Sequence, residues 1–114
     1  MSLREKQSLF VRLLATLIGR AGELGYQLTL GEAYRTPEQA ALNAKAGTGI
    51  ANSLHTQRLA IDLNLFRDGK FLDASEDHRE LGQWWEEQHE LCRWGGRFKR
   101  PDGNHYSLTH GGRA

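Results

Sequence analysis

Two histidines and two carboxylates are spaced along this chain in a way that could hold a catalytic metal. His55 precedes Asp62, and Asp102 stands three residues before His105. Two imidazoles and one carboxylate would fill three positions around a zinc ion and leave the fourth to water. Asp102 would then be the base that takes the proton of that water. From these residue types we expect a small zinc peptidase.

The segment around the first histidine resembles a motif of the M15 family of peptidoglycan peptidases. The family pattern is Ser-x-His-x-x-Gly-x-Ala-x-Asp, and Ser53, His55, Ala60 and Asp62 fall on it. The chain departs from the pattern at one position, where Arg58 replaces the usual glycine. This replacement removes none of the expected ligands. Its expected effect is on the backbone conformation between His55 and Asp62.

Two further segments extend the resemblance over about residues 30 to 108. Asp102 and His105 match the family's acidic residue three positions before a final histidine. Upstream, Tyr34-Arg35-Thr36 with Gln39 is similar to a family segment whose arginine faces the substrate. The resemblance therefore implies a Zn²⁺ site with the following roles: His55, Asp62 and His105 as ligands, Asp102 as general base, Arg35 as a catalytic and substrate-binding residue, and Ser53 as a contact to the peptide.

The role of Arg35 has an alternative. Its planar guanidinium suits a substrate carboxylate or a developing oxyanion. The same side chain could instead form a structural salt bridge at the end of the sheet. The residue type and the motif favour the functional role without deciding it.

The resemblance implies a zinc-dependent enzyme that cuts the peptidoglycan stem peptide. The aspartate at position 102, together with the small size of the chain, favours a phage endolysin that cuts between L-Ala and D-Glu, with a D-Ala-D-Ala carboxypeptidase as the next choice. A different class is an inactive structural module of the same fold that binds zinc or cell wall. Asp102 argues against that alternative, because a binding module needs no base beside the metal.

Length and composition limit the number of domains, the disulfides and the partners that the chain can have. The 114 residues suit one domain over 1–114, and the formal net charge of +1 gives no strong field for nucleic acid. One cysteine, Cys92, excludes an intrachain disulfide and fits synthesis in a reducing cytoplasm. The basic residues Arg97, Lys99, Arg100 and Arg113 would suit an anionic wall polymer, although an ordinary solvated surface explains them as well. We expect a monomer without nucleic-acid or membrane partners.

The apolar run Leu9–Ile18 is not expected to be an export signal, because Arg12 interrupts it and Glu5 precedes it. If the endolysin resemblance holds, the protein would be made in the host cytoplasm and act on the wall after a phage holin releases it.

The elements expected around the site form a small α+β domain with an antiparallel sheet and helices packed on one side, and the resemblance implies a Hedgehog/DD-peptidase-like fold. Apolar spacing predicts a helix through Leu9–Ile18 that stops near Gly25, and Thr36-Pro37 predicts the start of a second one that reaches Ala46. A third is expected over Glu76–Cys92, with Ser75 as its cap and Trp84 and Trp85 in packing roles.

Strands are expected at Gln27–Tyr34 and Leu59–Leu65, with a hairpin turn at Asp68-Gly69. Two short strands would follow within Trp94–Leu108, joined by a turn at Lys99–Gly103. Alternation along the second strand places Asp62 opposite its core-facing residues. The three remaining histidines, His78, His89 and His110, are expected at the surface, and Cys92 as a buried small hydrophobe.

Overall fold

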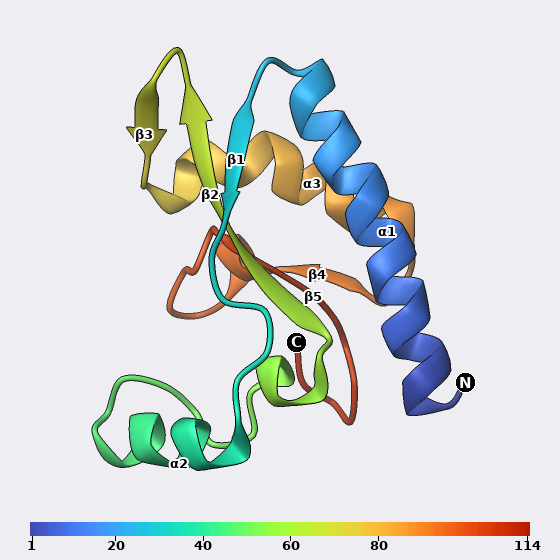
Figure 1. The fold of residues 1–114 in the computed structure, drawn as a ribbon, viewed down its shortest axis with the longest axis vertical. Coiled ribbons are helices and arrows are strands. Elements are labelled where there is room, and N and C mark those ends of the chain that lie inside the picture. The colour runs from blue at the N-terminus through green and yellow to red at the C-terminus, as the bar shows by residue number, and fades with distance from the viewer.

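The computed structural model describes residues 1–114 as a five-stranded sheet with three α-helices and three short 3-10 helices (Figure 1). The α-helices are α1 (Leu3–Glu23), α2 (Pro37–Lys45) and α3 (Arg79–Gln88). The strands are β1 (Gln27–Leu30), β2 (Ala60–Arg67), β3 (Lys70–Leu72), β4 (Cys92–Trp94) and β5 (His105–Leu108). The 3-10 helices are η1 (Leu54–Gln57), η2 (Ser75–His78) and η3 (Gly95–Arg97).

Strand β2 is the centre of the sheet. Its C-terminal half pairs with β1 on one side and with β3 on the other, and its N-terminal half pairs with β5, which in turn pairs with β4. All four pairings are antiparallel. The side chains of Leu59, Ile61, Leu63 and Leu65 are buried, whereas Asp62 is only partly buried on the opposite face. The expected alternation is confirmed.

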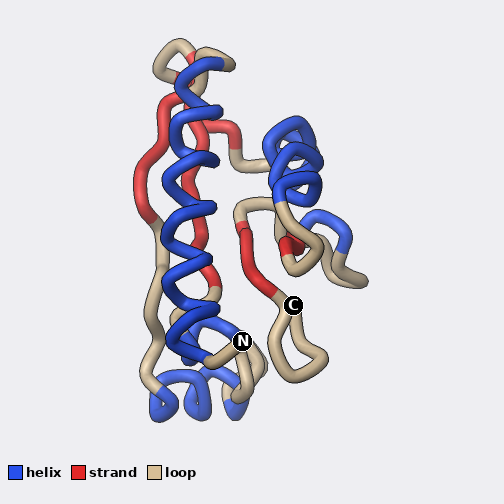
Figure 2. Tube along the Cα trace, turned by 90° about the vertical axis from the view of Figure 1, so that its right-hand side faces the viewer, coloured by secondary structure: helices blue, strands red, loops and turns tan.

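Helices α1 and α3 cover one side of the sheet, as predicted (Figures 1 and 2). Phe10 of α1 meets the indole of Trp85 edge to face, with ring centroids 6.0 Å apart. Trp85 is fully buried, and its Nε1 donates to the carbonyls of Arg93 and Ser107. Through these contacts Trp85 connects α1 and α3 to the β4–β5 pair. Burial of such large rings supplies much of the stability of a small core. Helix α2 lies apart, at the end of the molecule near η1 (Figure 1).

Local signals account for the helix starts. The Ser2 hydroxyl accepts from the amide of Glu5 while the Glu5 carboxylate accepts from that of Ser2, a capping box at the start of α1. The Thr36 hydroxyl accepts from the amide of Gln39, and Pro37 occupies the first turn of α2. The predicted hairpin is also confirmed, since Asp68 and Gly69 adopt positive φ angles of 52° and 76° between β2 and β3.

Three predictions of elements are wrong in their bounds. Of the two strands expected within Trp94–Leu108, the first is β4, which ends at Trp94, and Gly95–Arg97 form η3 instead. The expected helix over Glu76–Cys92 is η2 followed by α3, which ends at Gln88; His89 is extended and Cys92 begins β4. Pairing of Cys92 with Leu108 in the sheet overrides the helical pattern there. The expected strand Gln27–Tyr34 stops at Leu30, because the next residues leave the regular ladder to contact the site described below. No helix is long and apolar enough to cross a bilayer.

Candidate metal centre and cleft

Three side chains from three elements meet at one point. His55 comes from η1, Asp62 from β2 and His105 from β5, where Asp62 and His105 are direct partners in the antiparallel register. Asp62 Oδ1 lies 3.3 Å from His55 Nε2 and 3.6 Å from His105 Nδ1. One ligand atom from each residue falls within 4.8 Å of the other two. The structure thus brings the three expected metal ligands together.

Backbone contacts orient His55. Its Nδ1 lies 2.9 Å from the carbonyl oxygen of Ala33, and an Nδ1–H donor there leaves Nε2 with a free lone pair toward Asp62. The hydroxyl of Ser53 accepts from the His55 amide at 3.2 Å and caps η1. The His55 carbonyl accepts from the amide of Arg35. Residues 31–35 therefore act as a strap that fixes the imidazole from outside the sheet.

The same strap fixes Asp62. Its amide donates to the carbonyl of Glu32 and its carbonyl accepts from the amide of Gly31, each at 2.8 Å. A Cβ on Gly31 would lie only 2.8 Å from that carbonyl oxygen, so the close approach requires glycine. This pairing explains why the regular strand ends at Leu30: the next residues still bond to β2, but they bend around the cluster.

Arg58 adopts the left-handed conformation that the family's glycine would favour. Its φ of 56° and ψ of 36° terminate η1, and its amide donates to the carbonyl of His55. The guanidinium lies over the ring of Tyr34, 3.9 Å from its centre, in a cation–π contact. The turn between His55 and Asp62 is therefore kept in spite of the replacement.

The electrostatics of the cluster favour an ionised Asp62. Burial would raise the pKa of this carboxyl, but the facing His105 and His55 outweigh that effect and lower its pKa to about 2. Burial would lower the pKa of His55, and the interaction with Asp62 outweighs it and raises the value. Asp62 Oδ1 is nonetheless buried without a hydrogen-bond donor in good geometry. A divalent cation held by two imidazole nitrogens and this oxygen would satisfy the orphaned atom, so the donor set fits zinc.

Asp102 lies at the mouth of the same cleft, on a loop that several bonds hold in place. Its amide donates to the carbonyl of Gly95 at 2.9 Å, and its own carbonyl accepts from the amide of His105 at 3.1 Å. A Cβ at Gly95 would come within 2.1 Å of the Asp102 carbonyl, which accounts for glycine in the bend behind the site. Partial burial, assisted by the negative charge of Asp62, raises the pKa of the Asp102 carboxyl.

Arg35 forms a structural ion pair and also reaches the cleft. Its guanidinium pairs with the carboxylate of Glu32, and its side chain also lines the cleft, where it is 15% exposed. The ion pair with Glu32 outweighs burial and raises the pKa of Arg35. Sequence reasoning missed Glu32, because nothing in its spacing marks a carboxylate that faces an arginine three residues later.

The cleft that contains the cluster has a volume of about 680 Å³. Its walls come from the segment between α2 and η1, the segment between η3 and β5, and the C-terminal turn. Phe98 stands beside His105, with ring centroids 5.3 Å apart. Sequence reasoning did not place Phe98 or the C-terminal turn at this site.

The other histidines and Cys92 lie outside the cluster. His78 is buried, contrary to the expected surface position, because its Nδ1 lies 2.9 Å from the hydroxyl of Tyr106 in the core. His89 and His110 are partly exposed, and neither joins the metal-ligating group. Cys92 is buried as expected, and burial raises the pKa of its thiol to about 12.

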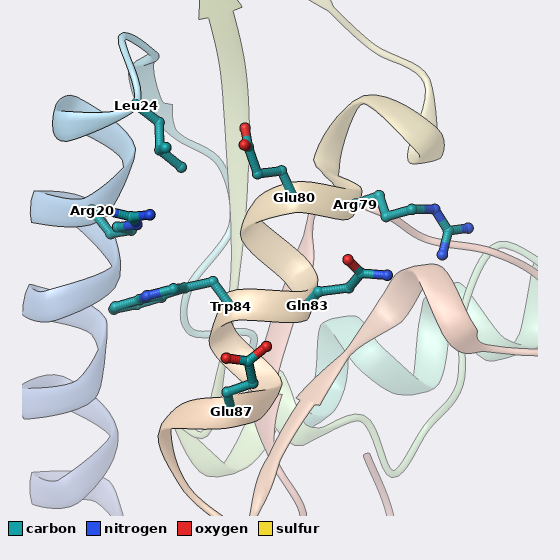
Figure 3. A pocket seen from close by; sticks show the side chains of 7 residues that line it. All are labelled: Arg20, Leu24, Arg79, Glu80, Gln83, Trp84 and Glu87. Carbon is teal, nitrogen blue, oxygen red and sulfur yellow. The ribbon is translucent and has the colours of Figure 1, made fainter.

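A second groove, of about 540 Å³, lies between α1 and α3 (Figure 3). Trp84 points from α3 toward α1. Arg20 of α1 and Leu24, which follows this helix, lie opposite, and Glu80 and Glu87 stand along the α3 side. Trp84 packs against the core from this position, as predicted. The possible metal ligands lie elsewhere, in the cleft around Asp62.

Comparison with known proteins agrees with this site. A family model described as D-alanyl-D-alanine carboxypeptidase, of the M15 peptidases, matches residues 46–108, more than half of the chain. The chain belongs to this family and is therefore a metallopeptidase whose class acts on peptidoglycan peptides. The matched region contains all three cluster residues and Asp102.

One solved structure confirms the expected fold. The L-Ala D-Glu endopeptidase ChiX of Serratia marcescens superposes with a TM-score of 0.70 at 20% sequence identity. The similarity covers 88% of this chain and 77% of that chain. No curated protein sequence matches the chain.

Proposed function

We propose that this protein is a zinc-dependent peptidase that cuts the peptidoglycan stem peptide between L-Ala and D-Glu. The convergence of His55, Asp62 and His105, with Asp102 in the same cleft, is the observation that carries the proposal. The similar structure belongs to an enzyme named for this bond, which supports it over the D-Ala-D-Ala carboxypeptidase that the family description favours. We further propose that the enzyme acts as a monomer.

In this mechanism His55, Asp62 and His105 would hold a zinc ion, which would act as a Lewis acid and lower the pKa of water to about 7. The Asp102 carboxylate accepts a proton from the attacking water and returns it to the amine as the scissile C–N bond breaks. Arg35 stands at the cleft wall, where it can donate to a substrate carboxylate or to the oxygen of the reacting carbonyl. Ser53 holds the His55 amide, and a contact of its hydroxyl to the peptide is an additional proposed role.

Digestion of purified peptidoglycan tests the proposal. The zinc-loaded protein is expected to release new D-Glu amino ends, whereas release of free D-Ala would identify the carboxypeptidase instead. Asp102→Asn should reduce kcat by about 10²–10⁴ while the protein keeps one zinc. Asp73→Asn, at an exposed aspartate outside the cleft, is the matched control and should remain active. Absence of cleavage by a protein that binds one zinc would favour an inactive wall-binding module.

We also propose that the protein is an endolysin that is made in the host cytoplasm and released by a holin. Expression in bacteria without a holin should leave the cells intact, and permeabilising the inner membrane should then cause rapid lysis. Asp102→Asn should abolish this lysis. Lysis of intact cells by the protein alone would contradict the proposed route.

A further inference from the structure

The charged side chains of the cleft are unevenly distributed. Four cations line it, Arg35, Lys99, Arg100 and Arg113, against the two carboxylates of Asp62 and Asp102. Arg35 already pairs with Glu32, and Asp62 faces the two histidines. Asp102 is then the one side-chain carboxylate left to balance Lys99, Arg100 and Arg113, so positive charge is in excess in a chain whose formal net charge is only +1.

These three cations have no acidic partner, which is common among the basic residues of this chain, but they line a cleft. Arg97, close to Lys99 in sequence, pairs with Glu86 at 2.7 Å, and Arg79 pairs with Glu76 at 2.6 Å. No ion pair involves Lys99, Arg100 or Arg113. A concave surface lined by unpaired charge of one sign attracts the opposite charge more strongly than an open surface does.

The three cations come from two walls of the cleft. Lys99 and Arg100 belong to the segment that leads from η3 to the Asp102 loop. Arg113 belongs to the C-terminal turn, which its backbone closes through paired hydrogen bonds with His110. Its guanidinium donates to the carbonyl of Asn52, another residue that lines the cleft, and this bond ties the C-terminal turn to the wall between α2 and η1. A guanidinium has five N–H donors, so most of them remain for a ligand.

We propose that Lys99, Arg100 and Arg113 form an anion subsite for a free carboxylate of the peptide substrate, separate from the group that Arg35 contacts. The proposal deepens the proposed function and rests on it, because it assigns a specificity to the same cleft. Under this proposal the enzyme selects stem peptides whose D-Glu carboxylate is free over the same peptides with that group converted to a carboxamide. A carboxamide keeps the shape and loses the charge that the subsite recognises.

Paired peptides test this selectivity. The substrates are a stem peptide with the free D-Glu carboxylate and its carboxamide analogue, cut by the zinc-loaded protein. The carboxamide should have a KM about three- to tenfold higher, with a similar kcat, because the contact is made before and during the reaction. The double variant Lys99→Ala/Arg100→Ala and the single variant Arg113→Ala should each raise KM for the carboxylate peptide and leave the carboxamide unaffected. Added salt should likewise raise KM for the carboxylate peptide and so reduce the preference for it over the carboxamide.

Arg97→Ala is the matched control, since Arg97 is a neighbouring arginine that lies outside the cleft. It should leave both KM values unchanged. Equal KM values for the two peptides, or an equal effect of Arg97→Ala, would overturn the subsite.

Calorimetric binding of the two peptides separates this proposal from the proposed function. If wild type cuts neither peptide, the proposed function fails. The subsite then stands if the carboxylate peptide binds more tightly than the carboxamide and the cleft variants abolish the difference, and it falls if the two bind alike.

Discussion

The guanidinium of Arg58 lies 3.9 Å from the centre of the Tyr34 ring, at the turn that leads from His55 to the strand of Asp62. Arg58 has a φ of 56°, which costs a residue with a side chain about 1 kcal/mol. A cation–π contact contributes about 0.5–1 kcal/mol at such a site. The contact thus offsets the strain of an arginine where the family pattern has glycine.

Substitution of Arg58 should separate the cost of the backbone strain from the contribution of the cation–π contact. Arg58→Ala keeps the strained backbone and loses the contact, so we expect the free energy of unfolding to fall by about 0.5–1 kcal/mol. Arg58→Gly loses the contact but relieves the strain, so its stability should stay closer to that of wild type. Denaturant unfolding of the zinc-loaded protein measures both.

Arg67 is the matched control for this comparison. Its guanidinium also lies 3.9 Å from a tyrosine ring, that of Tyr26, and its φ is not positive. Arg67 lies in β2, so the Arg67→Gly protein should be less stable than the Arg67→Ala protein. At position 58 the order should be the reverse, with Arg58→Gly more stable than Arg58→Ala. The same order at both positions would contradict the proposed strain at Arg58.

Metal binding should stabilise the fold through the orphaned Asp62 oxygen. Free zinc at a hundred times its dissociation constant should add about 2.7 kcal/mol to the free energy of unfolding, because the unfolded chain lacks the assembled ligands. EDTA should remove this gain, and Asp62→Asn should abolish stoichiometric binding. Calorimetric melting and metal analysis measure both effects. His110→Ala, at a histidine outside the cluster, should bind zinc normally; a loss of zinc there would contradict the ligand assignment.

The metal-free protein should be less stable in acid because of Asp62. The pKa of this carboxyl is about 2 in the fold and 3.8 without its neighbours, so the ionised form stabilises the fold above about pH 4. That contribution, about 2 kcal/mol, should disappear as the pH falls from 4 to 2. Denaturant titration at several pH values measures the loss, and Asp62→Asn should flatten the profile. An unchanged slope in the variant would exclude Asp62 as the source.

His55 should have the opposite effect in the metal-free protein. Its pKa is raised above the ordinary 6.5, so protonated His55 contributes stability fully below that value. The contribution should disappear as the pH rises through the folded pKa. NMR titration of the His55 ring should report the raised value, and Asp62→Asn should lower it. A ring that titrates at or below its ordinary value would contradict the ion pair.

Ser75 should matter for turnover although it lies outside the cleft. Its hydroxyl accepts from the amide of Gly103 at 2.9 Å, while the indole of Trp94 donates to the Gly103 carbonyl at 2.7 Å. These two bonds hold the loop that carries Asp102. Ser75→Ala should lower kcat several-fold and leave KM and zinc content unchanged, since a hydrogen bond of this kind contributes about 1 kcal/mol. Steady-state kinetics measures this, with the exposed Ser8→Ala as control; an unchanged kcat would exclude a positioning role.

The sequence by itself determined the elements whose signals are local. The cap at Thr36-Pro37 placed the start of α2, Asp68-Gly69 placed the hairpin, and alternation in β2 set Asp62 opposite the core side chains. The resemblance of the two histidine segments to the M15 motif predicted the ligand cluster, and the structure brings its three residues together. These features are set by interactions between residues close in the sequence, so a short sequence pattern is enough to predict them.

Tertiary structure decided the features that depend on distant partners. Pairing with Leu108 turned Cys92 from a predicted helix end into a strand, and the hydroxyl of Tyr106 drew His78 into the core. The hydrogen bond from Arg113 to the carbonyl of Asn52 likewise joins two segments that lie far apart in the sequence. Such contacts form because the sheet and the packed helices bring these side chains together, so a pattern along one segment cannot contain them.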